Sequence, residues 1–343
     1  MPLPGRPSFH SIESAPPGTC CAIPNRQIEG PVNPHLFVFQ DFHIHGASAP
    51  EWRQRYLQMS PGVMRSTLNE WSTGRMHVFR KWMSERVVQQ GSLPCGQLCF
   101  ALLGNDAVAG MRVQGREFGA GHLLILRGGQ EFEIQRPAGV ELLSVTFSAE
   151  AFSEFLDASP DAGNARRALA AAVVRPDAAA LDALRERVRA QLGSRSAEAP
   201  ADFMRAVREV LARGGDVPRQ RTSSGAAASL VKECQHIALT EIREQPLRIE
   251  ELCSRLRTSR RTLQNSFRQV TGASPVVYLR NLRLNAVRRR LMSTTGAELS
   301  VSHAAMDGGF EHLGHFAGSY KALFGETPSR TVRLASPPID RGD

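Results

Sequence analysis

The feature that most constrains this chain is a helical pattern that occurs twice in its C-terminal third. In the first copy, Ile249–Leu256 carries apolar residues at positions i, i+3, i+4 and i+7, which places them on one helix face. A short turn, Arg257–Thr258, leads into a second helical stretch over Ser259–Val270, which Thr258 or Ser259 can cap. Two short helices joined by a tight turn, the second with a polar outer face, are typical of a helix-turn-helix unit.

The second copy combines Val301–Phe310, a short helix that ends at Gly308–Gly309, with His312–Phe324. Between the copies, Pro275–Leu291 forms a further helical stretch that begins with proline, a favoured first residue of a helix. With an initial helix over Leu230–Arg243, the pattern predicts an all-helical domain in which a rigid helix joins two units. The residues expected to face inward in the second helix of each unit are Leu263, Phe267 and Val270, and Phe316, Tyr320 and Leu323.

The charge distribution of this region indicates a polyanionic partner. The whole chain has 42 basic and 33 acidic residues, a net charge of +9. Between Leu252 and Ala297 there are ten arginines and no acidic residue. Surfaces normally mix both signs, and the planar guanidinium group suits phosphate and guanine edges. A merely solvated basic face is the alternative, which charge alone does not exclude.

The outer faces of the two units differ in the side chains they offer to DNA. Arginine can donate two hydrogen bonds to guanine, and glutamine and asparagine can pair with adenine. The first unit turns Arg260, Arg261, Gln264, Asn265 and Arg268 outward, whereas the second turns outward His312, Leu313, His315 and Gly318. We therefore expect the second unit to contribute less sequence information and more backbone contact.

The joining helix has a suitable length and charge for DNA binding. Its 17 residues span about 25 Å, which can hold two recognition helices roughly one DNA turn, about 34 Å, apart. Arg280 and Arg283 in its first half are candidate phosphate contacts. Arg288–Arg290 are either further contacts or solvated surface, and the sequence does not separate these alternatives.

In the N-terminal region, the sequence pattern predicts strands rather than helices over most of residues 36–148. Many short apolar or alternating runs are punctuated by glycine, proline, asparagine and aspartate, which suggests a small β-barrel or β-roll. Glu51–Leu57 is predicted as a helix before most of the strands. The predicted strands are Leu36–Phe39, Met76–Met83, Leu98–Leu103, Ala107–Val113, His122–Leu126, Phe132–Ile134 and Glu141–Phe147.

Helical, alanine- and arginine-rich segments follow from Ala149 onward. They are Ala149–Ala158, Asn164–Val173, Ala178–Leu192 and Ala201–Ala212, and in the third of these Leu181, Leu184, Val188 and Leu192 share one face. These helices either cover the barrel or form a dimer interface. The glycine-, proline- and serine-rich segment Arg213–Ala227 is the best candidate for a linker. The expected organisation is an α+β chain with an arm (1–35), a sensor or dimerisation domain (36–212), a linker (213–228), a DNA-binding domain (229–335) and a tail (336–343).

Other chemistry is weakly supported. His43 and His45 could be metal ligands on one strand face, but no further ligand stands at a suitable spacing, so two polar strand or loop residues are favoured. Six cysteines are spread along the chain without a CxxC pair, which favours reduced thiols. Cys20–Cys21 and Cys95–Cys99 could be redox sensors, but nothing visible lowers their pKa. We expect no metal, no cofactor and no catalytic activity.

The sequence also carries no sign of export or membrane insertion. No apolar run reaches the roughly 18 residues needed to span a bilayer, and the N-terminus lacks an apolar signal core. The expected location is therefore the cytoplasm.

Three segments of the C-terminal third resemble the AraC/XylS family of bacterial regulators: Ser259–Phe267, Thr271–Leu291 and Gly308–Ser329. The resemblance covers nearly all of the family's domain of roughly 100 residues and implies that the second helix of each pair reads a major groove. Gly314 and Gly318 offer no side chain where many members place a polar one, which puts strong base readout by the second unit in doubt. The base-contact candidates are Arg260, Arg261, Thr262, Gln264, Asn265, Leu313, Gly314, His315 and Gly318, and the phosphate-contact candidates are Thr258, Ser259, Arg268, Arg280, Arg283 and His312.

The N-terminal half carries a weaker resemblance to the sensor half of the ethanolamine-utilisation regulators, through Trp52–Glu70, Met76–Glu85 and Leu126–Pro137. It implies a cupin-like sensor architecture but leaves the effector unidentified. The expected function is a ligand-responsive transcription activator that binds promoter DNA, a small-molecule effector and RNA polymerase, with a homodimer as a further expectation. A constitutive architectural DNA-binding protein is the alternative. A DNA-repair enzyme is less favoured, because no nucleophile has a visible activating neighbour.

Overall fold

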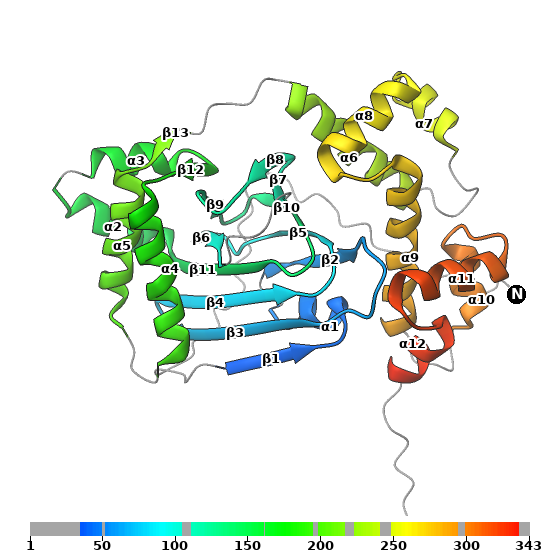
Figure 1. Ribbon diagram of the computed structural model, residues 1–343, viewed down its shortest axis with the longest axis horizontal. Coiled ribbons are helices and arrows are strands. Elements are labelled where there is room, and N and C mark those ends of the chain that lie inside the picture. Colours follow the sequence, from blue (N-terminus) through cyan, green and yellow to red (C-terminus); the bar gives the residue numbers. More distant parts are fainter. Residues whose placement is uncertain are drawn as a thin grey trace, which may run out of the picture.

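The computed structural model has a strand-rich N-terminal domain and a helical C-terminal domain (Figure 1). It describes residues 35–49, 52–104, 111–160, 162–194, 198–216, 223–240, 248–293 and 299–335. The expected tail and, apart from His35, the expected arm lie outside these ranges. None of the helices in these ranges is long and apolar enough to cross a membrane.

The strands of the N-terminal domain form two antiparallel sheets. The larger sheet has the order β1 (His35–Phe39), β3 (Ser66–Thr73), β4 (Met76–Met83), β11 (Glu141–Ser148), β6 (Gln97–Leu103), β9 (Leu123–Arg127), β12 (Val173–Arg175) and β13 (Gly215–Asp216). The smaller sheet has the order β2 (Arg55–Gln58), β5 (Val87–Ser92), β10 (Glu131–Arg136), β7 (Met111–Val113) and β8 (Arg116–Phe118). The α+β class is thus confirmed, whereas the described strands do not close into a barrel, so the cupin-like barrel is unconfirmed.

Most of the larger sheet is buried on both faces, although its edge strand β1 exposes Leu36, Phe37 and Val38. One face packs on the smaller sheet, and the other packs on the helices α2 (Ala149–Asp157), α3 (Gly163–Leu169), α4 (Ala178–Gly193) and α5 (Pro200–Ala212). The four α4 residues expected on one face, Leu181, Leu184, Val188 and Leu192, are all buried in that second core. This face therefore covers the sheet of its own chain and is not a dimer contact.

The predicted helix over Glu51–Leu57 is wrong. Residues Arg55–Leu57 belong to strand β2, in which Tyr56 pairs with Gln89 of β5. Tyr56 and Leu57 are both buried, because β2 lies between the inside of the domain and the C-terminal helices. Pairing with a strand that is distant in the sequence overrides the local helical pattern.

His43 and His45 were expected in a strand or loop, but the structure places them in a helix. They lie on helix α1 (Phe42–Ala47), which the Asp41 carboxylate caps by accepting from the backbone N–H of His43 at 2.6 Å. The His45 ring is buried and its Nδ1 contacts Ser66 Oγ at 2.6 Å. Burial lowers the pKa of His45 to about 2, so the ring is neutral. No cluster of metal-ligating side chains occurs among the residues that the structure describes.

The C-terminal domain contains α6 (Ser223–Thr240), α7 (Ile249–Arg255), α8 (Arg260–Thr271), α9 (Pro275–Ser293), α10 (Val301–Asp307), α11 (Leu313–Phe324) and α12 (Pro328–Ala335). Helices α7 to α11 follow the predicted bounds closely, whereas α6 begins within the segment expected as a linker and α12 was not predicted. The domain has two separate apolar cores, and α9 contributes Tyr278, Leu279 and Leu282 to the first and Leu284, Val287 and Leu291 to the second. The joining helix α9 therefore packs into the apolar core of each unit.

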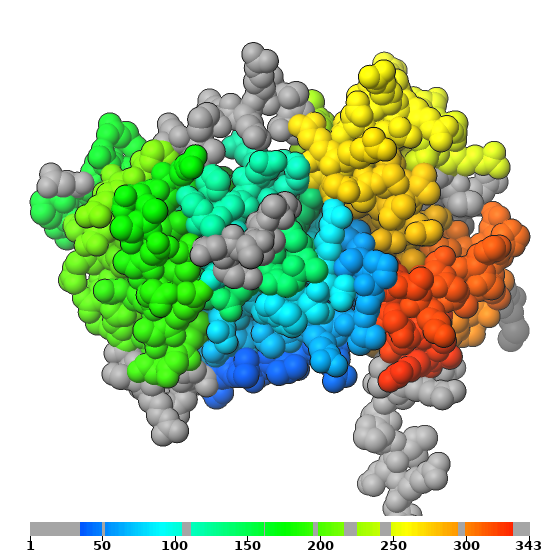
Figure 2. Space-filling model, viewed as in Figure 1, coloured from blue at the N-terminus to red at the C-terminus, as the bar shows by residue number. Residues whose placement is uncertain are grey.

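The two domains are packed against each other. Figure 2 shows the C-terminal domain, yellow to red, against one end of the N-terminal domain. Leu57 of β2 and Val88 of β5 belong to the same apolar core as the first helix-turn-helix unit. The smaller sheet thus forms the surface on which the C-terminal domain rests.

Candidate nucleic-acid interface

Helix α8, which is expected to be the recognition helix of the first unit, has a side-chain cap at its start and a left-handed glycine at its end. The Ser259 hydroxyl accepts a hydrogen bond from the backbone N–H of Thr262 at 3.0 Å, so Ser259, and not Thr258, caps the helix. Gly272 ends it in the left-handed conformation, with φ of 64°. Leu263, Phe267 and Val270 are buried as predicted. The face opposite to them is therefore held outward.

The outer face of α8 presents the expected polar side chains. Arg261, Gln264 and Asn265 are exposed, and within the described ranges none of them has a hydrogen-bond or ion-pair partner. Arg260 instead pairs with Glu250 at 3.1 Å, and both side chains are about two-thirds exposed. The donors and acceptors of the first three residues are thus available to a ligand.

The second recognition helix, α11, presents a much smoother face. Its apolar residues Phe316, Tyr320 and Leu323 are buried, and Leu313, Gly314, His315 and Gly318 are exposed. A Cβ atom built on Gly314 or Gly318 would meet nothing within 4 Å. Packing within the chain therefore does not require glycine at these two positions, although each glycine lowers helix stability by about 1 kcal/mol relative to alanine. The structure leaves a strip of bare backbone at the surface.

The two candidate phosphate contacts on α9 differ in availability. Arg280 is exposed. Arg283 is half-buried, with its guanidinium carbon 5.1 Å from the Phe310 ring centroid and its Nη1 donating to Gly309 O at 3.2 Å. Burial, and secondly the charge of Arg280, lower the pKa of Arg283. Of the two, Arg280 is the freer cation.

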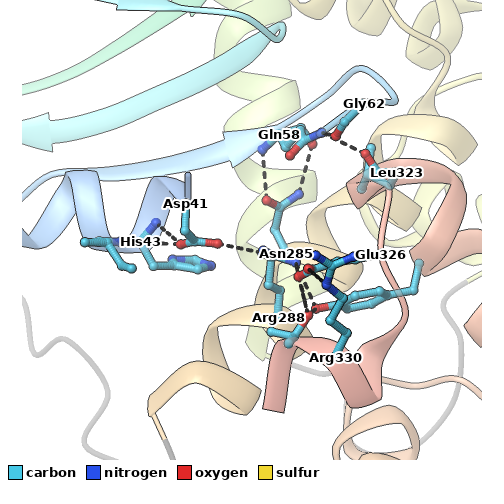
Figure 3. A network of polar contacts seen from close by, with 12 residues as sticks. Asp41, His43, Gln58, Gly62, Asn285, Arg288, Leu323, Glu326 and Arg330 are labelled. Atoms are coloured by element: carbon cyan, nitrogen blue, oxygen red, sulfur yellow. Dashed lines mark hydrogen bonds and ion pairs between the residues drawn. The ribbon is translucent and has the colours of Figure 1, made fainter. Parts of the chain in front are cut away.

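Arg288 is neither a free contact nor solvated surface, the two alternatives that the sequence left open. Its Nε donates to Asp41 Oδ2 at 2.8 Å and its Nη1 to Glu326 Oε1 at 2.8 Å (Figure 3). All three side chains are about one-tenth exposed or less. Asp41 comes from the N-terminal domain, so this buried ion pair crosses the domain interface. The helical spacing indicated that Arg288 would be buried, because it lies on the same helix face as the buried Leu284 and Leu291, at i, i+4 and i+7.

Of the cysteines in the described ranges, Cys99 and Cys234 are buried, Cys253 is partly buried and Cys95 is exposed. Burial raises the pKa of Cys99 to about 11 and that of Cys234 to about 12, so both are protonated near neutral pH. None of the described cysteines forms a disulfide.

Comparison with known proteins places the strongest similarity in this domain. Residues 252–333 match a family model described as "Helix-turn-helix domain". The XylDLEGF operon transcriptional activator 2 of Pseudomonas putida is 38% identical over 91 residues, which are 26% of this chain and 58% of that protein. The XylDLEGF operon transcriptional activator of the same organism is 35% identical over 120 residues, which are 35% of this chain and 36% of that protein.

A solved structure gives a similar result. A probable AraC family transcriptional regulator from Rhodopseudomonas palustris is 33% identical, and the match covers 32% of this chain and 99% of that chain, with a TM-score of 0.28. Of the two Pseudomonas putida activators, the matched region covers little more than half of the first and about a third of the second. The C-terminal region is a helix-turn-helix domain, and its similarity to proteins named as transcriptional activators supports the expected AraC/XylS family. These similarities leave the likeness of the N-terminal half to ethanolamine-utilisation regulators untested.

Proposed function

We propose that this chain is a sequence-specific DNA-binding transcription regulator in which α8 reads bases and α11 mainly follows the DNA backbone. The observation that carries the proposal is the outer face of α8, where Arg261, Gln264 and Asn265 are exposed over a buried opposite face and have no partner among the residues that the structure describes. These three side-chain types are the ones that recognise guanine and adenine in the major groove. The bare backbone at Gly314 and Gly318 suits close approach to a surface and offers no base-reading group.

We further propose that the N-terminal domain binds a small-molecule effector and that the chain activates transcription together with RNA polymerase. The names of the Pseudomonas putida relatives describe them as transcriptional activators. A separate strand-rich domain that contacts both helix-turn-helix units is a suitable relay for an effector signal. Promoter DNA, the effector, RNA polymerase and a second copy of the chain are the proposed partners.

Fluorescence anisotropy with labelled duplexes tests the DNA-binding proposal. The full chain is titrated into a fragment from upstream of its own gene and into a scrambled duplex of equal length, over a series of salt concentrations. We expect tighter binding to the upstream fragment and a steep loss of affinity with salt, because each neutralised phosphate contributes about 0.9 to the logarithmic slope. Absence of binding to either duplex at low salt would refute the proposal.

A thermal-shift screen tests the sensor proposal. A ligand that binds only the folded chain raises its unfolding temperature in a concentration-dependent way. We expect at least one small molecule to do so and to change the affinity for the upstream fragment. A ligand that stabilises the chain without any change in DNA affinity argues for a constitutive DNA-binding protein.

A further inference from the structure

Both recognition helices end against the N-terminal domain. The carbonyl of Thr271, the last residue of α8, accepts a hydrogen bond from Arg86 Nη2. The carbonyl of Leu323, in the last turn of α11, accepts from Gln58 Nε2 at 2.7 Å and from the backbone N–H of Gly62 at 3.1 Å. Carbonyls in the last turn of a helix have no partner within the helix, so they need an external donor. Here the other domain supplies that donor to both helices.

The two capping side chains start from the same place in the smaller sheet. Gln58 ends β2, and Arg86 directly precedes β5. The two strands pair at Gln58 and Val87, and the backbone N–H of Met59 donates to Arg86 O at 2.8 Å. One end of one β-ladder therefore reaches the ends of both recognition helices.

The joining helix is fixed at the same point. The backbone N–H of Gln58 donates to Asn285 Oδ1 at 2.8 Å, and Asn285 Nδ2 donates back to Gln58 O at 3.0 Å (Figure 3). Both residues are 2% exposed. β2 is an edge strand of its sheet, so these backbone groups face away from β5. The side-chain amide supplies one donor and one acceptor, as a neighbouring strand would.

The fit at both helix ends is close. Each helix ends in a left-handed glycine, with φ of 64° at Gly272 and 73° at Gly325. A Cβ atom built on Gly272 would lie 2.9 Å from Arg86 Nη2, and one built on Gly325 would lie 2.5 Å from Val63 Cγ2. The N-terminal domain thus touches the two helix ends directly.

These contacts matter because the two helix-turn-helix units have separate cores. Within the C-terminal domain, both cores depend on the single helix α9. A link through one helix leaves bending and twisting of that helix as a soft degree of freedom. A second link through the smaller sheet would restrict that freedom.

We propose that Arg86 and Gln58 are positioning residues for DNA recognition, through which the N-terminal domain sets the separation and relative twist of α8 and α11. The spacing between the two major-groove sites that one chain can engage at once then depends on contacts that lie outside both recognition helices. The inference rests on the proposed role of α8 and α11 as recognition helices.

Pulsed electron paramagnetic resonance measures the positioning directly and without DNA. Spin labels are attached at Gln264→Cys on α8 and His315→Cys on α11 in the full chain, with the native cysteines replaced by serine or alanine. We expect one narrow distance distribution for the otherwise unchanged chain. The double variant Arg86→Met/Gln58→Met, which keeps side-chain volume but removes both donors, is expected to broaden that distribution at least twofold. The single variant Arg86→Lys keeps a donor at that position and the native Gln58. It is expected to give a distribution whose width lies between those of the unchanged chain and the double variant.

The matched control is Arg80→Met, since Arg80 pairs with Glu141 inside the N-terminal domain at 3.6 Å. It is expected to leave the distance distribution unchanged. Equal widths for the double variant and the unchanged chain, with both folded by circular dichroism, would overturn the inference. If the double variant does not fold, the single variant Arg86→Lys replaces it in the comparison. A wider distance distribution than that of the unchanged chain then supports the inference, and an equal width overturns it.

Binding to DNA gives the functional readout. Duplexes are selected from a randomised library by the unchanged chain, and one or two base pairs are then inserted between the two selected half-sites. We expect the insertion to weaken binding by the unchanged chain at least tenfold and by the double variant less than threefold, with equal affinity of both for the first half-site alone. An unchanged spacing preference in the double variant contradicts the inference, whereas failure of the unchanged chain to select any DNA contradicts the proposed function.

Discussion

The two recognition helices occupy equivalent places in their units but differ in the side chains that they expose. α8 is capped by the Ser259 side chain and carries free polar groups, whereas α11 begins at His312 without a side-chain cap and exposes bare backbone at Gly314 and Gly318. A good bidentate base contact is worth about 1–3 kcal/mol of discrimination, which α8 can provide and the glycines of α11 cannot. Duplication of a scaffold therefore does not imply duplication of its readout.

The units also differ in how firmly they are tied to the rest of the chain. The second unit is anchored by the buried Arg288, which pairs with Asp41 of the N-terminal domain and with Glu326. The first unit shares an apolar core with the smaller sheet instead. Apolar packing thus dominates the contact of the first unit, which also includes the Arg86–Thr271 hydrogen bond and the Lys232–Glu131 ion pair, whereas a buried ion pair anchors the second unit.

The largest expected effect comes from breaking the charged anchor. Arg288→Met leaves the buried Asp41 without its ion-pair partner and leaves Glu326 with the more exposed Arg330 at 3.8 Å, and it should cost about 3–5 kcal/mol of unfolding free energy. Because Arg288 contacts α11 and α12 side chains, amide exchange should rise more in the second unit than in α8. Denaturant unfolding and hydrogen exchange measure both quantities.

Its control is the neighbouring Arg290, which pairs with Asp307 at a more exposed position. Arg290→Met should cost no more than about 1 kcal/mol. Equal losses for the two variants would contradict the view that charge anchors the second unit.

The next effect tests α8 as the sequence reader. Arg261→Ala removes two potential base contacts and should weaken binding to the selected site by about 1–3 kcal/mol, with relaxed preference at one base position. Anisotropy titrations on the selected duplex and its single-base variants measure this. A uniform loss on all duplexes would instead assign Arg261 to the backbone.

Arg280 is expected to behave in the opposite way. Arg280→Ala should weaken all sequences alike and reduce the salt slope by about 1, because an exposed arginine near a phosphate releases a counterion. Arg283→Ala should change the slope less, since its guanidinium is already engaged by Gly309 and Phe310. If Arg283→Ala gives the larger change in slope, the assignment of the two arginines is reversed.

The smallest effect tests the bare backbone of α11. Gly318→Ala should raise the stability of the chain by up to about 1 kcal/mol, since the added methyl meets nothing within 4 Å. It should also weaken DNA binding if the backbone approaches the duplex closely. Thermal unfolding and anisotropy together decide, because a gain in stability with unchanged affinity would show that the strip does not face DNA.

The sequence predicts the bounds of helices α7 to α11 closely, but it does not predict α12 or the start of α6. Buried stripes, the Ser259 cap and the closing glycines are local signals, since they depend on residues within one or two helical turns. The exposed faces follow from the same periodicity. Base-reading candidates such as Arg261 and Gln264 are therefore identifiable from the sequence alone.

The sequence predicts the N-terminal domain less well. Alternation identifies strands such as β4, but it does not identify β2, β3 or β5, and part of β2 falls in the wrongly predicted helix. Strand pairing joins segments far apart in the chain, and its hydrogen bonds outweigh weak local preferences. No local pattern marks Gln58 as a strand residue.

By itself, the sequence determined where the recognition helices begin and end and which side chains they turn outward, because helix caps and helical periodicity act over short distances. Only the tertiary structure decided that Arg288 is a buried anchor and that Gln58 and Arg86 cap both recognition helices. Those contacts join residues separated by 185 to 265 positions. Their formation depends on how two folded surfaces meet, which no short stretch of sequence encodes.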